Sequence, residues 1–203
     1  MRPSEVEQRL RTWFREENLD VRTQTNDRAE MHLLVRYPHG RNAHVFGVTI
    51  PRGRDLVAVS SVTRVDAGQQ AMMADAIAED PEEWREWMHE TRMQLIRSGV
   101  DWSVHLGHAE SGRTGPLQAF NVSEPIWFDG LDKNAIMQLL RKLWLAKLGI
   151  IHEVKFAFGA GSGEVGPVDD WIPKSSNGSE EAAPVEVDEA GTFGTGFDPS
   201  EWV

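Results

Sequence analysis

The sequence has no cysteine in its 203 residues, which excludes a disulfide, a thiolate metal site and a cysteine nucleophile. It also lacks an apolar run of the roughly 18 residues that a membrane-spanning helix needs. The N-terminal segment, MRPSEVEQRLRTWF, is charged throughout and has none of the apolar stretch that is typical of a signal peptide. We therefore expect a cytoplasmic protein with no membrane partner.

Basic residues are scarce toward the C-terminus. Residues 161–203 contain ten acidic residues and one basic residue, Lys174, and so contribute −9 of the net charge of −11. Residues 1–160 carry 22 acidic and 20 basic residues and are close to neutral. Tight nucleic-acid binding requires a positive surface, so the composition disfavours a nucleic-acid partner.

Residues 1–158 show the apolar periodicity of a globular domain with a core. Ser4 and Glu7 form a capping-box pattern that predicts a helix from Ser4 to about Asn18. Asp80 and Asp132 are expected N-caps, and Gly99 is an expected C-cap. The predicted strands are 31–37, 44–50, 56–65, 100–106 and 117–127, and the predicted helical regions are 67–98, broken at residues 80–81, and 132–149.

The order of the predicted elements indicates the fold class. The order of elements is α-β-β-β-α-β-β-α, which predicts an α+β fold with an antiparallel sheet of about five strands and helices packed on it. Residues 150–158 are apolar, and their periodicity fits either a continuation of the last helix or a short extra strand. The expected domain is therefore 1–158.

Residues 159–203 form the second expected unit, a flexible acidic tail with a terminal aromatic motif. Residues 161–203 hold seven Gly, four Pro and no Leu or Met, so they cannot bury enough apolar surface to offset their ordering entropy. Phe193, Phe197 and Trp202 nevertheless lie within the last eleven residues. The tail is either a solubilising extension or a short motif that docks on a partner or back on the body.

No linear motif of a catalytic or metal site accompanies the polar residues. His105 and His108, near Glu110, are three residues apart, a spacing that on a strand puts the two side chains on opposite faces, so surface or loop histidines are the favoured interpretation. Ser60 and Ser61 have no nucleophile signature around them. The glycine-rich segment 159–163 lacks the Lys and the following helix of a phosphate loop, which favours a hinge. We predict no catalytic residue, cofactor or metal ion.

Trp84 and Trp87 lie three residues apart on one predicted helix face. Core packing is the favoured interpretation for this pair. If they are partly exposed, they become candidate partner-binding residues, because tryptophan is enriched at the hot spots of protein interfaces. The candidate partner-binding residues are thus Trp84, Trp87, Phe193, Phe197 and Trp202.

Three segments carry a resemblance to a known family: MHLLVRYP at 31–38, GVDW at 99–102 and IWFDGL at 126–131. In these segments the chain resembles an uncharacterised archaeal family, the domain of unknown function numbered 2299. The order of elements also looks like the type III secretion chaperone class of folds. That resemblance covers roughly residues 1–157 and implies a non-enzymatic protein that binds other proteins, often as a homodimer.

The favoured hypothesis is a non-enzymatic, chaperone-like adaptor that binds a protein partner through its body and its tail. One alternative is an enzyme whose site has no linear motif. Another is a nucleic-acid-associated protein that uses Arg52, Arg54 and Arg64 and is autoinhibited by its acidic tail.

Overall fold

The computed structural model describes residues 1–40, 43–108, 114–164 and 166. Its elements are α1 (Pro3–Glu16), β1 (Val21–Thr23), β2 (Ala29–Tyr37), β3 (His44–Pro51), β4 (Leu56–Arg64), α2 (Ala67–Glu79), α3 (Pro81–Ser98), β5 (Asp101–His108), β6 (Thr114–Trp127) and α4 (Lys133–Phe158). The α+β fold with an antiparallel sheet is confirmed, although the sheet has six strands. The additional strand β1 has three residues, too few for alternation to predict it.

The strands form one sheet in the order β1-β2-β3-β4-β6-β5, and each neighbouring pair is antiparallel. β4 and β6 pair over nine residues, from Leu56 opposite Trp127 to Arg64 opposite Ala119. This long pairing joins two parts of the chain that α2, α3 and β5 separate in sequence. It also starts β6 three residues earlier than the sequence predicts, because Thr114 pairs with His108.

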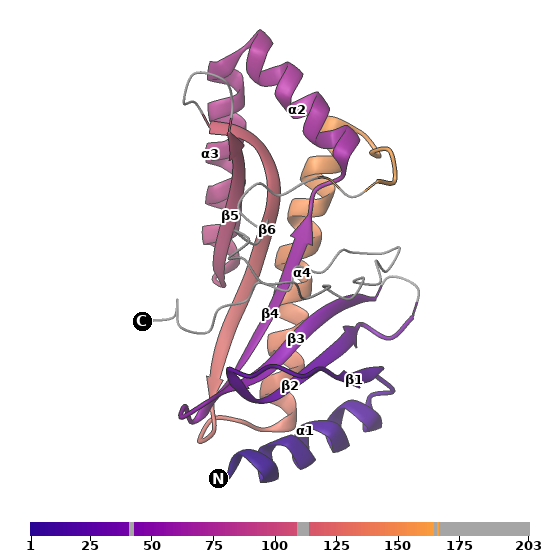
Figure 1. Ribbon diagram of the computed structural model, residues 1–203, viewed down its shortest axis with the longest axis vertical. Coiled ribbons are helices and arrows are strands. Elements are labelled where there is room, and N and C mark those ends of the chain that lie inside the picture. Colours follow the sequence, from indigo (N-terminus) through magenta and orange to yellow (C-terminus); the bar gives the residue numbers. More distant parts are fainter. Residues whose placement is uncertain (41–42, 109–113, 165, 167–203) are drawn as a thin grey trace, which may run out of the picture.

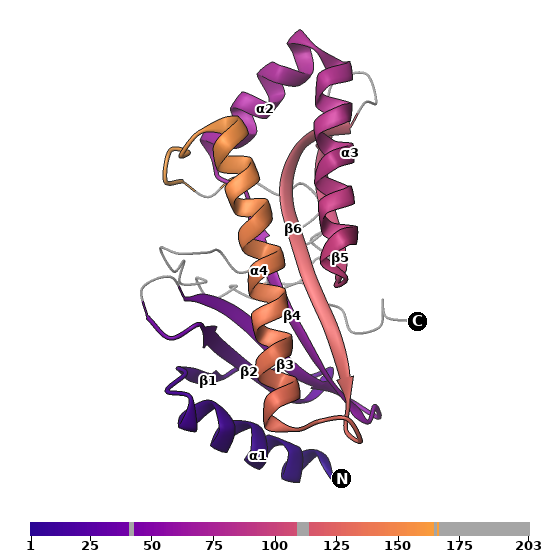
Figure 2. The ribbon, with the colours of Figure 1, turned by 180° about the vertical axis from the view of Figure 1, so that it is seen from behind.

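The helices cover one face of the sheet. α4 packs against β2, β4 and β6, α2 and α3 pack against α4, and α1 packs against β2. Figure 2 shows α3 and α4 in front of the strands, and Figure 1 shows the strands from the opposite side. Since alternate strand residues point to opposite faces, Phe46, Val48 and Val59 enter the core beneath the helices. In the described part of the chain, no helix crosses the other face of β2, β3 and β4 (Figure 1).

The helix ends agree with the sequence at three of four predicted caps. The side chain of Asp80 accepts hydrogen bonds from the backbone of Glu82 and Glu83, that of Asp132 accepts one from Ala135, and Gly99 ends α3 in the left-handed conformation. The Ser4 cap is wrong. Helix α1 begins at Pro3 with Arg2 as N-cap, since proline suits the first helical position.

Helix α4 continues without a break through residues 150–158 and ends at Gly159. The structure therefore resolves the open alternative in favour of helix. Gly149 lies inside α4, where a Cβ atom would come within 2.9 Å of Gln94 Nε2 on α3. Glycine at this position lets the two helices approach closely. Among the helices of the described residues, none is long and apolar enough to cross a membrane.

Candidate functional site

A buried polar pair lies on the helix-covered face of the sheet. Lys147, from α4, donates a hydrogen bond from Nζ to Ser61 Oγ on β4 at 2.9 Å. Ser61 Oγ in turn donates to the carbonyl oxygen of Val45 on β3 at 2.7 Å. Lys147 and Ser61 are only 2% and 3% exposed. Burial lowers the pKa of Lys147 to about 7, because desolvation penalises the charged ammonium.

The direction of these hydrogen bonds opposes nucleophilic catalysis. An activated serine needs a base that accepts its proton and a path for substrate to reach its oxygen. Here the single proton of Ser61 is directed at the carbonyl of Val45, and Lys147 is the donor to Ser61. Both side chains are also sealed between α4 and the sheet. We therefore read the pair as a structural link between α4, β4 and β3.

His44 titrates in the environment of the same lysine. Burial, together with the nearby positive charges of Lys147 and Lys155, lowers the pKa of His44 to about 4. Its Nδ1 atom is buried, and no hydrogen-bond partner for it exists in the described structure. His44 is consequently neutral at pH 7 and adds no positive charge beside Lys147.

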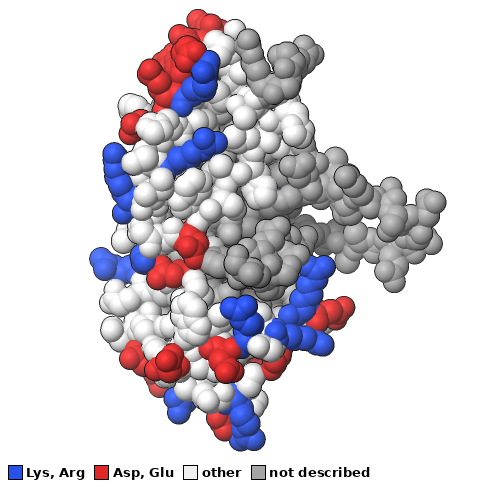
Figure 3. All heavy atoms as spheres, turned by 90° about the vertical axis from the view of Figure 1, so that its left-hand side faces the viewer, with Lys and Arg blue, Asp and Glu red and all other residues white. Residues whose placement is uncertain are grey.

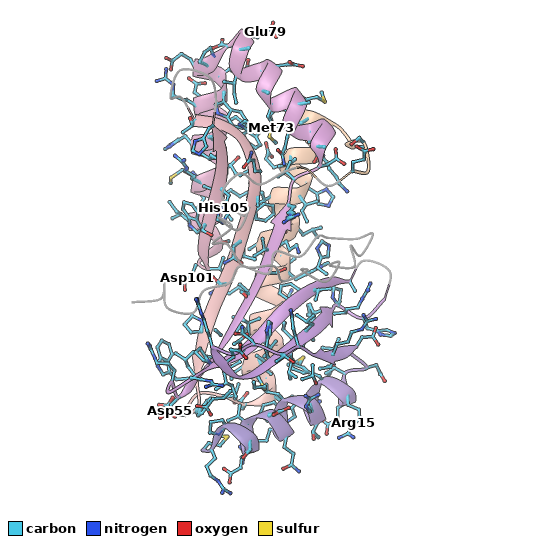
Figure 4. All side chains as sticks on the ribbon, in the orientation of Figure 1. Arg15, Asp55, Met73, Glu79, Asp101 and His105 are labelled. Carbon is cyan, nitrogen blue, oxygen red and sulfur yellow. The ribbon has the colours of Figure 1, made fainter. Side chains whose placement is uncertain are left out.

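A second group of polar residues lies on the opposite face of the sheet. Gly47 pairs with Ser60, and Ser60 pairs with Ser123, which is opposite Asp101 on the edge strand β5. A Cβ atom on Gly47 would lie 3.4 Å from His32 Nε2 and 3.6 Å from Ser60 Oγ, so the imidazole and the hydroxyl flank this glycine. Figure 4 shows Asp101 and His105 along β5, at the margin of this face.

This row contains serine, histidine and aspartate without the geometry of a catalytic triad. A triad needs the carboxylate hydrogen-bonded to the histidine that faces the serine. Asp101 is two strands from Ser60, about 10 Å away, on the side opposite His32. His32 Nδ1, the atom that a carboxylate should orient, is buried with no partner among the described residues. The row does not support an acyl-transfer mechanism.

The charged residues at paired positions on this face are mostly arginine. Arg22 on β1 is opposite Leu34, Arg36 on β2 is opposite Val45, and Arg64 on β4 is opposite Ala119. All three occupy the alternate register that points away from the core residues. Asp101 is the acidic residue at the described paired positions of this face, since Glu124 pairs with the core residue Val59 and lies on the helix-covered face. The paired positions of this face thus hold three arginines and one aspartate.

The arginines proposed for nucleic-acid binding do not come together. Arg52 and Arg54 lie in the turn before β4, and Arg64 lies at the end of that nine-residue strand, about 30 Å away. Figure 3 shows the side that carries β5 and α3, where positive and negative side chains are interspersed. On the side in view, the described residues form no continuous basic stripe of the kind that follows a phosphate backbone.

The structure places Trp84 and Trp87 against the C-terminal end of α4. Their rings stack with centroids 5.1 Å apart, and Phe158 contacts Trp87 edge-on at 5.0 Å. Trp84 is only 4% exposed, and Trp87 is partly buried against the core. This is the core packing that the sequence favours for the pair. A partner-binding role for these two residues stays a prediction, as it does for Phe193, Phe197 and Trp202, which lie outside the described residues.

His105 and His108 both lie on β5, where they pair with Ala119 and Thr114. Irregular registers at Leu106 interrupt the strict alternation between them. In the described ranges, no group of three or more His, Cys, Asp or Glu side chains could hold a metal ion.

Asp66 fastens the segment after α4 to the body. Its Oδ1 atom accepts hydrogen bonds from Gly68 N and Gln69 N, which caps α2, and from Ser162 N at 2.8 Å. Its Oδ2 atom accepts one from Gly163 N at 2.7 Å. Burial raises the pKa of Asp66, but these hydrogen bonds outweigh it and hold the pKa below its ordinary value. We call this arrangement the Asp66 clasp.

Further hydrogen bonds join the residues after α4 to the body. Gln69 Nε2 donates to the carbonyl of Gly159, Ala67 N donates to that of Glu164, and Gly166 N donates to that of Val65. The described residues 159–164 and 166 thus make hydrogen bonds to the body, including the segment 159–163 that the sequence suggests as a hinge. Sequence reasoning missed these contacts because the clasp joins residues about 96 positions apart.

Comparison with known proteins supports the family that the three sequence segments suggest. A crystal structure of an uncharacterized protein from Methanothermobacter thermautotrophicus has 28% identity and a TM-score of 0.64, covering 75% of this chain and 99% of that one. A crystal structure of YbjN from E. coli, a candidate transcription regulator, matches with 10% identity and a TM-score of 0.37, covering 70% of this chain and 89% of that one. A TM-score this low carries no conclusion about fold or role.

A search of curated proteins finds no match to the chain. The likeness to type III secretion chaperones is not tested by these matches and stays a prediction. The family model for uncharacterized conserved proteins, DUF2299, matches residues 6–154 and thus nearly the whole body. The chain belongs to the DUF2299 family.

Proposed function

We propose that this protein is a non-catalytic binding module whose sheet face, on the side away from the helices, binds an acidic polypeptide segment of a protein partner. One observation carries the proposal: the described helices cover a single face of the sheet, and the other face carries Arg22, Arg36 and Arg64 against Asp101. Guanidinium groups bind carboxylates with two parallel hydrogen bonds, which suits recognition of acidic side chains.

The two clusters that could carry chemistry support the same reading. The hydroxyl of Ser61 is committed to a backbone carbonyl, and Asp101 is too far from His32 to orient it. The sheet face instead offers apolar and small side chains between the arginines, including Leu34, Val45 and Val62. A bound segment can place apolar or aromatic side chains over these residues while its carboxylates meet the arginines.

Site-specific photocrosslinking tests this function. A photoreactive phenylalanine analogue replaces Leu34 or Val62 on the sheet face, or Leu145, which is 47% exposed on the outer side of α4, as the matched control. The full chain is irradiated in an extract of the cells that make it, and crosslinked proteins are identified by mass spectrometry. We expect one defined partner from positions 34 and 62, absent from position 145 and lost with Arg22→Glu/Arg36→Glu.

Equal capture from position 145, or capture that survives the double charge reversal, contradicts binding on this face. A crosslinked second copy of the chain assigns the surface to a homodimer instead. No crosslink from any position contradicts the proposed function as a whole.

A further inference from the structure

The described chain ends beside the sheet face that we propose to bind a partner. Gly166 N donates to the carbonyl of Val65, the residue directly after Arg64 at the end of β4. A Cβ atom on Gly166 would lie 2.1 Å from Gln70 Nε2 and 2.5 Å from the oxygen of Val65, so only glycine lets the backbone lie this close. Together with the Asp66 clasp, this contact places Gly166, the last described residue, at the end of β4.

Gly166 lies at the end of the sheet that carries Arg36 and Arg64. Gly47 is opposite Ser60, so the antiparallel register extends to bring Val45 beside Val62, and Val45 is opposite Arg36 on β2. Arg36 and Arg64 therefore lie at the same end of the sheet, two strands apart, about 10 Å across it. Arg22 lies on the edge strand β1, next to β2, where it is opposite Leu34, two residues before Arg36.

Residues 167–203 are rich in the carboxylate side chains that the arginines of this face can bind. They contain nine acidic residues and one lysine, and their last eleven residues include Phe193, Phe197 and Trp202. We propose that this segment of the chain's own C-terminal region docks on the sheet face, with its carboxylates on Arg22, Arg36 and Arg64 and an aromatic side chain over the apolar residues between them. It thereby competes with the partner, so the inference rests on the proposed function.

The length of the segment permits this contact. From Gly166 to Phe197 there are 31 residues, and a polypeptide of that length reaches at most about 100 Å. The sheet from β4 to β1 is three strand spacings wide, about 14 Å. A segment tethered at this distance has an effective concentration in the millimolar range, so contacts of low intrinsic affinity are occupied much of the time. The attraction is electrostatic and weakens as salt screens it.

Paramagnetic relaxation enhancement tests the docking in the full chain. Since the sequence has no cysteine, Ser200→Cys provides a single attachment point for a nitroxide label. We expect loss of amide signal in β2, β3 and β4, with signal retained along the described α1. The loss is relieved by Arg22→Glu/Arg36→Glu and by high salt. It persists with Arg9→Glu/Arg15→Glu, a matched reversal of two exposed arginines on α1. Dispersed amide spectra verify that each variant is folded.

Strand signals that stay sharp with the label attached overturn the inference, as does broadening that the sheet-face reversal leaves unchanged. Broadening that disappears on mixing labelled chain with excess unlabelled chain is intermolecular, and it overturns self-docking in favour of a second copy. If the strands stay sharp while positions 34 and 62 still crosslink a partner, self-docking fails and the proposed function stands. If docking is observed and partner crosslinking rises with Phe197→Ala/Trp202→Ala, both stand.

Discussion

Lys147 is the residue whose environment departs furthest from ordinary solution conditions. Its ammonium group is fully buried and has a single hydrogen-bond acceptor, Ser61 Oγ, among the described contacts, with the ring of Phe46 5.9 Å from Nζ. A cation in such a place costs free energy that one neutral hydroxyl does not offset. The protein therefore keeps this lysine largely uncharged above pH 7, at the expense of stability.

This cost sets the sign of the pH dependence. The pKa of Lys147 is about 7 in the folded protein and 10.5 in the unfolded chain. Between these values the unfolded chain binds the additional proton, so the free energy of unfolding rises with pH across the window from about 7 to 10.5. We expect Lys147→Met to remove this rise and to be more stable than the parent at pH 7, by an amount on the order of a few kcal/mol.

Urea unfolding at pH 7 and pH 10 measures the effect, with Lys155→Met as the control because that lysine is exposed on the same helix. If Lys147→Met has the same change in stability between the two pH values as the parent, Lys147 is charged in the folded protein and our account of the buried pair is wrong.

At the scale of elements, the Asp66 clasp joins the start of α2 to the segment after α4. One carboxylate satisfies two backbone N–H groups of α2 and two of the segment 162–163. Asp66→Ala should lower the free energy of unfolding by about 1 kcal/mol through loss of the helix cap. It should also speed amide hydrogen exchange at Ser162 and Gly163.

Asp80→Ala is the matched control, because Asp80 caps α3 in the same way and has no contact with residues 162–163 in the described structure. We expect a similar loss of stability without faster exchange at those two amides. Unchanged exchange in Asp66→Ala is the result that contradicts the clasp.

Helix α4 is the element on which the core depends. Leu140 is fully buried where α4 meets the sheet, whereas Leu145 is 47% exposed on the same helix. Leu140→Asp places an unpaired charge in the core and should unfold the body, because that cost is comparable with the whole stability of a domain. Leu145→Asp should keep a melting temperature within a few degrees of the parent. Near-native melting of Leu140→Asp in circular dichroism argues against this core assignment.

The elements that the sequence predicts well are those with local signals. Capping residues that act within three positions mark the helix ends. Helix α3 begins after Asp80 at Pro81 and ends at Gly99, and α4 begins after Asp132. The alternative over residues 150–158 had no such signal, because an apolar run fits both a helix and a strand. Contact of Phe158 with Trp84 and Trp87 shows what the run packs against, and that partner lies about 70 residues away in the sequence.

At the scale of the whole molecule, the sheet order decides which polar residues meet. Ser60 and Ser61 look alike in the sequence, yet alternation sends Ser61 beneath α4 to Lys147 and Ser60 to the opposite face beside Gly47. The excess of arginine on that face is equally hidden, because Arg22, Arg36 and Arg64 come from three strands. Sequence reasoning grouped Arg64 with Arg52 and Arg54, which the strand length separates.

The position of α4 at the end of the described elements has a consequence during synthesis. Strands β1–β6 can pair as soon as they leave the ribosome, but residues such as Val48, Val59 and Val122 have no helical cover until residues 133–158 emerge. Until α4 is made, the nascent polypeptide therefore exposes the apolar face of its sheet, which favours aggregation with other chains.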